Sequence, residues 1–290
     1  MRRLIIIAVA LLTVFAFSSC KKDGVYKPGR KINRIYYSYS SDYSQTQKYL
    51  KQRWNWDGKL LKSINYYSSS GSLNYTLEFT YDGKRLTRVD DYSDGESVRF
   101  TYDGRKLSKM GYYEREVLYE EIDFTYDGGK ISRIDWQEIG KKSSKGKSML
   151  TDILPIVIPS QGESISRSLE LAKNESKSLE YGTIKFTWDG GNITEVENEE
   201  NGWVSHSTYT YDDCKNPYKG FVLGLGDEGG VIFGSKNNVT REIYTSSSGS
   251  VSEYNYSYSY DGKWPERQTC SYTYSSGGYY SSTNYYEYED

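Results

Sequence analysis

Apolar and polar side chains alternate along most of this chain with a period of two residues. In residues 77–81, Leu-Glu-Phe-Thr-Tyr, the apolar side chains fall on one face and the polar ones on the other. This period is typical of a half-buried β-strand. Similar runs occupy residues 98–102, 122–126, 184–188 and 256–260. The pattern therefore predicts a chain built mainly of strands.

An aromatic residue followed by Asp-Gly ends each of these runs. Asp-Gly favours a two-residue hairpin, because a type I′ turn needs positive φ at both central positions. The tripeptide occurs at Trp56-Asp57-Gly58, Tyr81-Asp82-Gly83, Tyr102-Asp103-Gly104, Tyr126-Asp127-Gly128, Trp188-Asp189-Gly190 and Tyr260-Asp261-Gly262, with a degenerate copy at Tyr211-Asp212-Asp213. Polar stretches such as 68–72 and 93–96 predict the turns at the opposite ends of the strands.

A second motif follows several of the turns. It reads Leu-Thr-Arg-Val at residues 86–89 and recurs in varied form at 107–110, 131–134 and 193–196. Its apolar residues are three apart, so a regular strand would place them on opposite faces. Either the first of them packs beside the turn, or a β-bulge intervenes.

Counted in this way, about sixteen strands follow one another through short connections, so neighbours should be antiparallel. A sheet this wide curls or closes, and closure removes its edges. We predict an all-β fold, an antiparallel up-and-down meander that forms a barrel or a barrel-like curled sheet. It would be a single domain over residues 31–290.

The face opposite the aromatic residues is charged or rich in threonine, so we predict that it faces water and that the aromatic face is the interior of a soluble body. Its residues include Glu78, Thr80, Arg99, Thr101, Asp123, Thr125, Lys185 and Thr187. The alternative is a membrane pore with the aromatic face turned to lipid. Tyrosine hydroxyls disfavour that arrangement away from the membrane interface.

Two insertions interrupt the period, near residues 138–179 and 212–236. By strand parity the first leaves from the serine-turn end and the second from the Asp-Gly end. We expect their apolar parts to fold over or into the two open ends. For 138–179, whose start is rich in Lys and Ser, a loosely attached loop is the alternative.

The N-terminus carries an export signal. Arg2 and Arg3 precede an apolar stretch at residues 4–17, which is too short for a comfortable membrane span. Small residues before Cys20 resemble a lipobox. We therefore predict a signal peptide at 1–19, acylation of Cys20, for example by palmitate, and a tether at 20–30. The protein would be lipid-anchored to the outer membrane, on either face; an ordinary signal peptide with a chance cysteine is the alternative.

The amino-acid composition excludes several classes of protein and gives no sign of a catalytic or metal site. The chain has 32 Tyr and 16% aromatic residues, which excludes ordinary disorder. A mean hydropathy of −0.76 excludes a bundle of membrane helices. The net charge of −2, without a basic block, gives no reason to expect a nucleic-acid partner. The single histidine, His206, is predicted to be exposed on a strand, and no metal, cofactor or catalytic constellation is apparent.

Much of the remaining tyrosine lies in doublets, whose members point to both faces of a strand. A terminal strand pairing with residues 31–40 would gather several of them. We predict a ligand-binding patch from Tyr36, Tyr37, Tyr66, Tyr67, Tyr279, Tyr280, Tyr285 and Tyr286. The predicted function is non-catalytic binding, with a glycan as one candidate ligand. The alternative is a structural subunit docked on another envelope protein, and a hydrolase is least favoured.

Two further cysteines, Cys214 and Cys270, would lie in a compartment that permits a disulfide. A bridge between them and a pair of thiols are equally compatible with the sequence.

The hairpin unit resembles the YD repeat of Rhs-type shells. Residues 20–23 (Cys-Lys-Lys-Asp), the Phe-Thr-Tyr-Asp-Gly hairpins, residues 215–218 (Lys-Asn-Pro-Tyr) and 236–240 (Lys-Asn-Asn-Val-Thr) are together similar to a family of Bacteroides-type lipoproteins of unknown function with a porin-like fold. The resemblance covers most of residues 20–290. It implies an antiparallel barrel-like sheet in the cell envelope and supplies no catalytic residues, and the insertion at 138–179 departs from its pattern.

Overall fold

The computed structural model describes residues 28–41, 44–91, 93, 95–140, 181–219, 235–273 and 279–289. The predicted signal peptide, Cys20 and the tether up to residue 27 lie outside the described residues. Most of the first insertion (141–180) and the middle of the second (220–234) also lie outside them, so the expectation that the first insertion packs on the barrel is not addressed.

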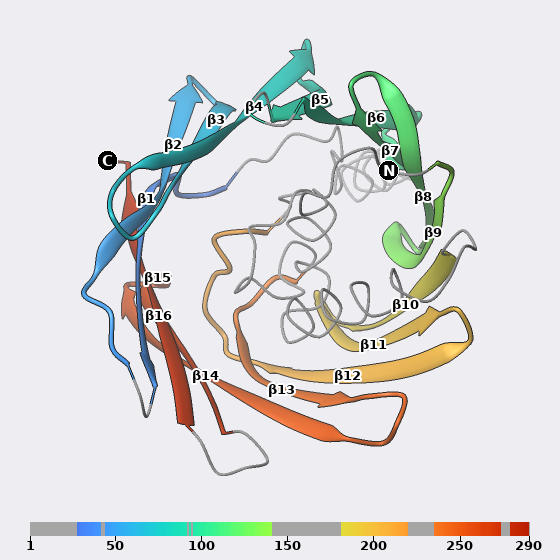
Figure 1. Ribbon diagram of the computed structural model, residues 1–290. Coiled ribbons are helices and arrows are strands. Elements are labelled where there is room, and N and C mark those ends of the chain that lie inside the picture. The colour runs from blue at the N-terminus through green and yellow to red at the C-terminus, as the bar shows by residue number, and fades with distance from the viewer. Residues whose placement is uncertain are drawn as a thin grey trace, which may run out of the picture.

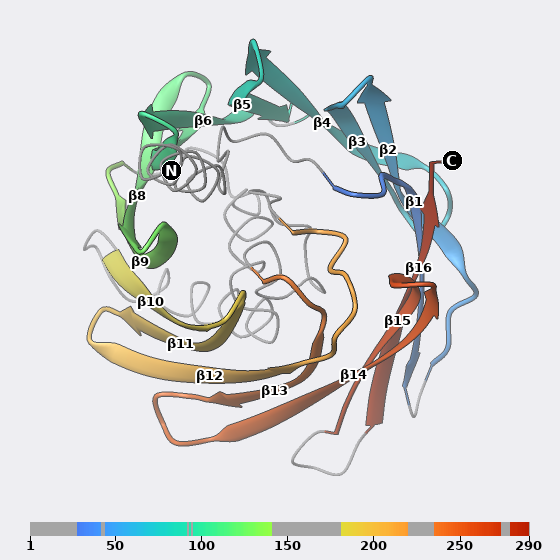
Figure 2. The same ribbon diagram turned by 180° about the vertical axis from the view of Figure 1, so that it is seen from behind.

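Sixteen strands form one closed barrel, in which every strand is antiparallel to both neighbours and β1 pairs with β16. Figures 1 and 2 show the ring from its two ends. The predicted fold class and strand number are therefore confirmed. The strands are β1 (Ile32–Ser41), β2 (Tyr49–Asp57), β3 (Leu60–Tyr67), β4 (Leu73–Asp82), β5 (Arg85–Asp91), β6 (Glu96–Asp103), β7 (Lys106–Glu114), β8 (Val117–Asp127), β9 (Lys130–Glu138), β10 (Tyr181–Asp189), β11 (Asn192–Glu200), β12 (Trp203–Tyr211), β13 (Val239–Thr245), β14 (Val251–Asp261), β15 (Trp264–Thr273) and β16 (Tyr279–Tyr288).

The Asp-Gly turns all lie at one end of the barrel, which we call the Asp-Gly end. Their glycines have positive φ, for example 59° at Gly83 and 57° at Gly104, as the predicted turn type requires. The start of β1 and the end of β16 also meet here, because the Glu289 amide donates a 2.9 Å hydrogen bond to the Lys31 carbonyl. The opposite end carries the serine-rich connections and is called the serine-loop end.

The predicted bulge is present in the Leu-Thr-Arg-Val motif. Thr80 pairs with Arg88 and Tyr81 with Leu86, so Thr87 is the extra residue. The Thr87 hydroxyl donates a 3.1 Å hydrogen bond to the Thr80 carbonyl. Hydroxyls of the equivalent residues make the same bond in three other hairpins: Ser108, Ser132 and Thr194. The bulge explains why apolar residues three apart both reach the interior.

The aromatic residue of each unit links neighbouring hairpins. The Tyr102 hydroxyl donates a 2.8 Å hydrogen bond to the carbonyl of Leu86, which belongs to the preceding hairpin. Two other units repeat this bond, with Tyr81 donating to Leu61 and Trp188 to Ile131. In the last unit the bond to Val239 comes from Tyr258, two residues before the aromatic residue of the turn. A tyrosine or tryptophan at this position therefore fills the core and satisfies a main-chain acceptor at once.

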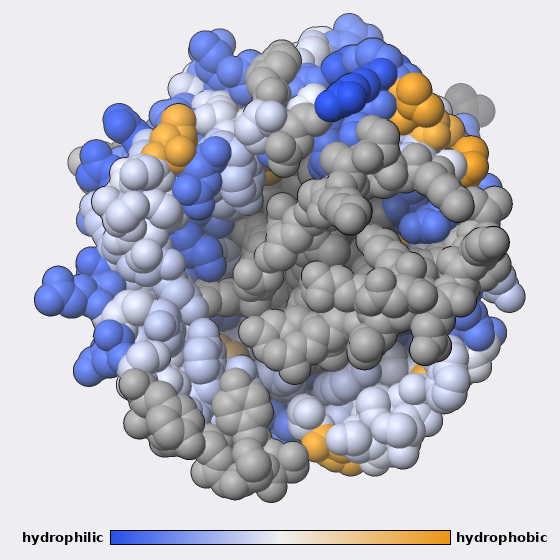
Figure 3. Space-filling model, in the orientation of Figure 1, coloured by the Kyte–Doolittle hydropathy of each residue, from blue (hydrophilic) through white to orange (hydrophobic). Residues whose placement is uncertain are grey.

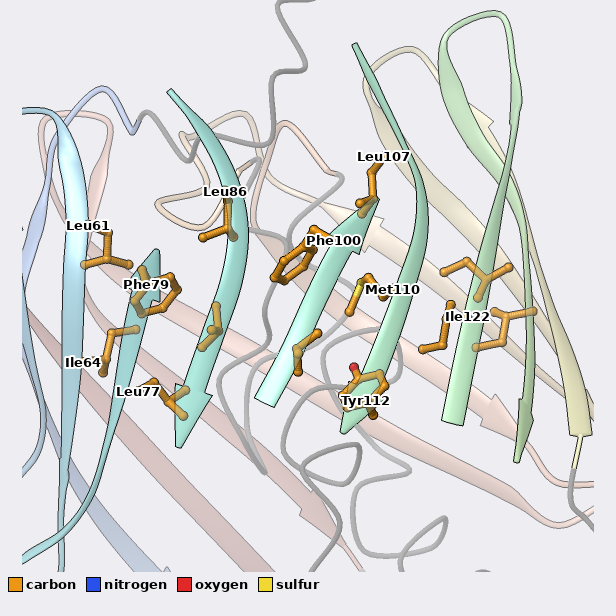
Figure 4. Close-up of a cluster of buried hydrophobic side chains, with 14 of the residues drawn as sticks. Leu61, Ile64, Leu77, Phe79, Leu86, Phe100, Leu107, Met110, Tyr112 and Ile122 are labelled. Carbon is orange, nitrogen blue, oxygen red and sulfur yellow. The ribbon is translucent and has the colours of Figure 1, made fainter. Parts of the chain in front are cut away.

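The interior of the barrel is the apolar and aromatic face of the sheet. Side chains such as Ile64, Val89 and Val98 are fully buried there, and Figure 4 shows neighbouring strands contributing them to one continuous layer. The outer face carries ion pairs, including Lys185–Glu197 at 2.6 Å and Arg241–Glu253 at 2.8 Å. The predicted orientation of the two faces is confirmed. In the described part of the chain, no helix has the length and hydropathy needed to cross a membrane.

The described ends of the second insertion turn into the barrel at the Asp-Gly end (Figure 1). The Tyr218 ring lies 6.4 Å from that of Trp54 on β2 and 6.0 Å from that of Tyr286 on β16. Asp212 holds the two ends together by accepting hydrogen bonds from the amides of Cys214 and Asn238. These described ends thus pack against the core, whereas the apolar parts of the insertion, 221–225 and 231–233, lie outside the described residues.

Candidate functional site

The closing pair of strands brings most of the predicted tyrosine doublets together. Tyr36 lies directly opposite Tyr285, and Ile35 opposite Tyr286, in the β1–β16 pairing. The doublets nevertheless divide between the two faces of the sheet. The eight tyrosines therefore form no single patch: some side chains point into the lumen and others lie on the outer wall.

The outer group centres on Tyr36 and Tyr285. The Lys48 ammonium lies 4.5 Å from the centre of each ring and sits over both. Arg34 and Glu287 form an ion pair beside them. Because the cation already covers both rings, this group has little free aromatic surface. Tyr67 and Tyr279 also belong to the outer members, and Tyr279 is 44% exposed.

The inner members contribute to a larger group, which we call the inner tyrosine cluster. It consists of Tyr37, Tyr39, Tyr49, Tyr254, Tyr272 and Tyr280, near the serine-loop end of the lumen. Tyr280 is its centre. Its hydroxyl lies 2.9 Å from that of Tyr37, and its ring is 4.9 Å from Tyr272 and 6.2 Å from Tyr39. Five consecutive strands, β14, β15, β16, β1 and β2, therefore present one arc of rings.

Most rings of the arc are half-buried. Tyr39, Tyr49, Tyr254, Tyr272 and Tyr280 each keep part of their surface accessible, whereas Tyr37 is buried. The Lys51 ammonium lies 4.4 Å from the centre of the Tyr37 ring, so the cluster already holds one cation on an aromatic face. Such a surface offers flat apolar area together with several phenol groups that donate and accept hydrogen bonds.

Two of the predicted tyrosines that point inward, Tyr66 and Tyr286, fall outside this cluster. Tyr66 on β3 is buried and stacks on Tyr75 at 4.3 Å. Tyr286 is buried deeper in the barrel and donates a 2.9 Å hydrogen bond to Gln268. Both side chains therefore act in core packing.

Four residues of the cluster were not among the predicted site residues: Tyr39, Tyr49, Tyr254 and Tyr272. Tyr39 follows Tyr37 by two residues, so strand parity could have identified it. Tyr49 could not be found in this way. The register shifts so that Ile35 faces Gln52 and Tyr36 faces Leu50, which makes Lys51 a bulge residue and turns Tyr49 inward.

Acidic side chains line another part of the barrel wall towards the serine-loop end. Asp91 faces Glu96 across β5 and β6, and Glu96 faces Glu114 across β6 and β7. All three are buried, as is Glu120 on β8. Like charges placed directly opposite one another destabilise a sheet. The structure thus places carboxylates where a purely structural core would carry apolar residues.

His206 lies on the outer wall, as predicted, with its Nδ1 4.0 Å from a Glu197 carboxylate oxygen. The hydrogen bond from Lys185 lowers the pKa of Glu197. No disulfide joins Cys214 to Cys270; both retain the thiol form. Within the described ranges, no group of three histidine, cysteine or acidic side chains could hold a metal ion.

The fold is similar to that of two porin-like proteins of known structure. One, from Bacteroides uniformis, is 12% identical with a TM-score of 0.53, and the match covers 89% of this chain and 98% of that one. The other, from Bacteroides vulgatus, is 13% identical with a TM-score of 0.50, covering 90% and 99%. Searches of family models and of curated proteins found no match.

At these identities the likeness shows the fold alone. The porin-like fold implied by the sequence resemblance is confirmed. Lipid anchoring, the resemblance to YD repeats and ligand binding stay predictions.

Proposed function

We propose that this protein is a non-catalytic, lipid-anchored barrel of the bacterial cell envelope that binds a ligand at the inner tyrosine cluster. The observation that carries the proposal is the arc of half-buried rings around Tyr280. Core packing alone does not call for so many phenol groups with accessible surface at one place.

A polyhydroxylated ligand, such as a glycan, fits this surface best. Sugar rings present apolar C–H faces that stack on flat aromatic rings, and their hydroxyls pair with phenols. Tyrosine also supplies contact area with little loss of side-chain entropy, because it has only two rotatable side-chain bonds.

The test is a glycan array probed with the whole protein, followed by titration of each positive polysaccharide. We expect Tyr272→Leu and Tyr280→Leu each to weaken binding about tenfold, as is usual when an aromatic anchor is removed. The matched control is Tyr285→Leu on the outer wall, which should bind like the wild type. Binding that survives both inner substitutions, or an array without any signal, would contradict the proposal.

The anchor is tested separately. Replacing Cys20 with serine removes the only thiol that a lipoprotein pathway could acylate at this site. We expect the wild type to incorporate a labelled fatty acid and to fractionate with membranes, and the Cys20→Ser protein to lose the label. Equal labelling of both proteins would show that Cys20 is not the acylated residue.

The polar outer wall supports an anchored body over a membrane-spanning one. A transmembrane barrel needs an apolar band facing the lipid, whereas ion pairs such as Arg133–Asp135 and Lys185–Glu197 lie on the outside here. The acyl chains would then supply the attachment to the envelope that the wall itself does not provide.

A further inference from the structure

We propose that the serine-loop end of the barrel docks directly on a phospholipid bilayer surface, through a ring of exposed apolar side chains. This proposal goes beyond ligand binding and does not depend on acylation of Cys20. It rests on where the described residues place their exposed hydrophobic side chains.

Every large exposed hydrophobic side chain of the described residues lies at this one end. Single exposed apolar residues are ordinary on protein surfaces, but they are not normally confined to one rim. Val117 is 68% exposed and Trp203 67% exposed. The full set is Leu73, Val117, Ile139, Tyr181, Trp203, Val204, Val251 and Tyr279.

These side chains all lie at the serine-loop ends of their strands. Leu73, Val117, Tyr181, Trp203, Val251 and Tyr279 are the first residues of β4, β8, β10, β12, β14 and β16, Val204 is the second residue of β12, and Ile139 directly follows β9. Because these strands are distributed around the ring, the side chains border the mouth on several sides.

The spacing of the ring favours lipid over a protein partner. The apolar core of a protein interface is a contiguous patch, whereas Figure 3 shows separate orange patches on a blue and white surface. A bilayer needs no contiguity, since each side chain inserts on its own. Trp203, Tyr181 and Tyr279 are also the residue types that gather at the membrane–water interface.

The charges of the two ends agree with this orientation. Asp-Gly turns place an acidic residue and usually a Lys or Arg in each connection, as in Asp82 and Lys84. At the serine-loop end, the charged residues in the described connections are Lys48, Arg115 and Glu116. Lys48 is held between two tyrosine rings, and Glu116 forms ion pairs with Arg88 and Arg99. Among the described connections, the serine-loop end therefore carries fewer charged residues than the Asp-Gly end, although Arg115 and Glu116 are exposed there.

The experiment measures partition into vesicles of phosphatidylcholine, with or without phosphatidylglycerol. Every protein carries Cys20→Ser and the same N-terminus, so any contribution of that segment is equal throughout. We expect the triple variant Leu73→Thr, Val117→Thr, Val251→Thr to partition about tenfold or more weakly than the parent. Threonine keeps the β-propensity of these strand positions. Partition should occur with phosphatidylcholine alone, because the proposal assigns it to apolar side chains.

Two controls assign the effect to the rim. Valine in place of Thr101, Thr125 and Thr187 adds apolar surface to the exposed outer wall and should leave partition unchanged. Brominated lipid should quench part of the tryptophan emission of the parent, and Trp203→Phe should remove that part while partition persists. A parent that does not partition, a triple variant that partitions equally, or absence of Trp203 quenching would overturn the proposal. A parent dimer that the triple variant loses without lipid would assign the rim to a second copy instead.

Discussion

Replacing Gly182 with alanine is expected to destabilise the barrel by about 3 kcal/mol, at the upper end of the usual effect of overpacking. Gly182 lies opposite Trp136 across β9 and β10. A Cβ atom there would stand 2.5 Å from Trp136 Nε1 and 2.7 Å from the Glu199 carbonyl oxygen. Part of this contact is with main chain, so a change of side-chain rotamer cannot relieve all of it. Glycine in a strand often marks such a close approach.

Urea unfolding followed by circular dichroism measures this effect, and Trp136 emission reports whether the indole moves. Gly140→Ala is the matched control, because its new Cβ would meet its nearest neighbour, the Leu118 carbonyl oxygen, at 3.6 Å. That variant should stay within about 0.5 kcal/mol of the wild type. If Gly182→Ala unfolds at the wild-type urea concentration, the indole does not pack on Gly182 as described.

Alkaline solution is expected to unfold the barrel near pH 11. Burial raises the pKa of Tyr81 and of Tyr126 to about 12. It also raises the pKa values of Tyr112, Tyr209, Tyr256 and Tyr258 well above their usual value. These groups stay neutral in the folded chain, whereas in the unfolded chain they ionise near pH 10.

Alkali lowers the free energy of unfolding, because these tyrosines lose their protons at a lower pH in the unfolded chain than in the folded chain. Each folded pKa is raised, so the contribution of these tyrosines is fully present below pH 10 and is lost as the pH rises towards the folded pKa. Each tyrosine then lowers the free energy of unfolding by up to about 1.4 kcal/mol per pH unit. The four fully buried tyrosines together remove about 6 kcal/mol at pH 11, which is comparable with the whole stability of a typical domain. Tyr81 and Tyr126 add less, because solvent screens their partly exposed side chains.

Urea midpoints between pH 8 and pH 11, with phenolate absorbance as a second signal, measure this loss. Tyr112→Phe is the informative variant. The Tyr112 hydroxyl is buried without a hydrogen-bond partner, so its removal should leave stability at pH 8 equal or higher by about 1 kcal/mol. It should also reduce the fall in the free energy of unfolding between pH 8 and pH 11 by the contribution of one tyrosine, about 1.4 kcal/mol. Stability that stays level up to pH 11 would contradict the burial of these phenols.

The hairpin architecture could be predicted because each of its signals is local. Asp-Gly sets the turn, two-residue alternation sets the buried face, and the three-residue spacing in the Leu-Thr-Arg-Val motif reflects the bulge at Thr87. Short connections then leave antiparallel neighbours as the simple solution, and sixteen strands favour closure.

The inner tyrosine cluster is harder to predict, because it depends on the register between strands. The two-residue period of a strand places Tyr36 and Tyr37 on opposite faces of the sheet. It does not place Tyr49, because the bulge at Lys51 turns that side chain inward. Tyr66 has the same doublet signature as Tyr37, yet its neighbour Tyr75 makes it part of the core. The polar stretch 93–96 predicts a turn, whereas Glu96 begins β6 and is buried beside Asp91 and Glu114. A carboxylate inside a barrel has no local sequence signal.

The pairing of β1 with β16 has one more consequence. The main-chain bond between Glu289 and Lys31 sets the two ends of the folded chain side by side, at the same rim as the Asp-Gly turns. Each strand has two antiparallel partners, so the barrel is a cycle of hairpins with no first or last member. A covalent join between residues 289 and 31, with a new opening at any single turn, would keep every strand pairing intact. The sequence thus sets which strand comes first and last, while the strand pairing of the folded barrel is circular.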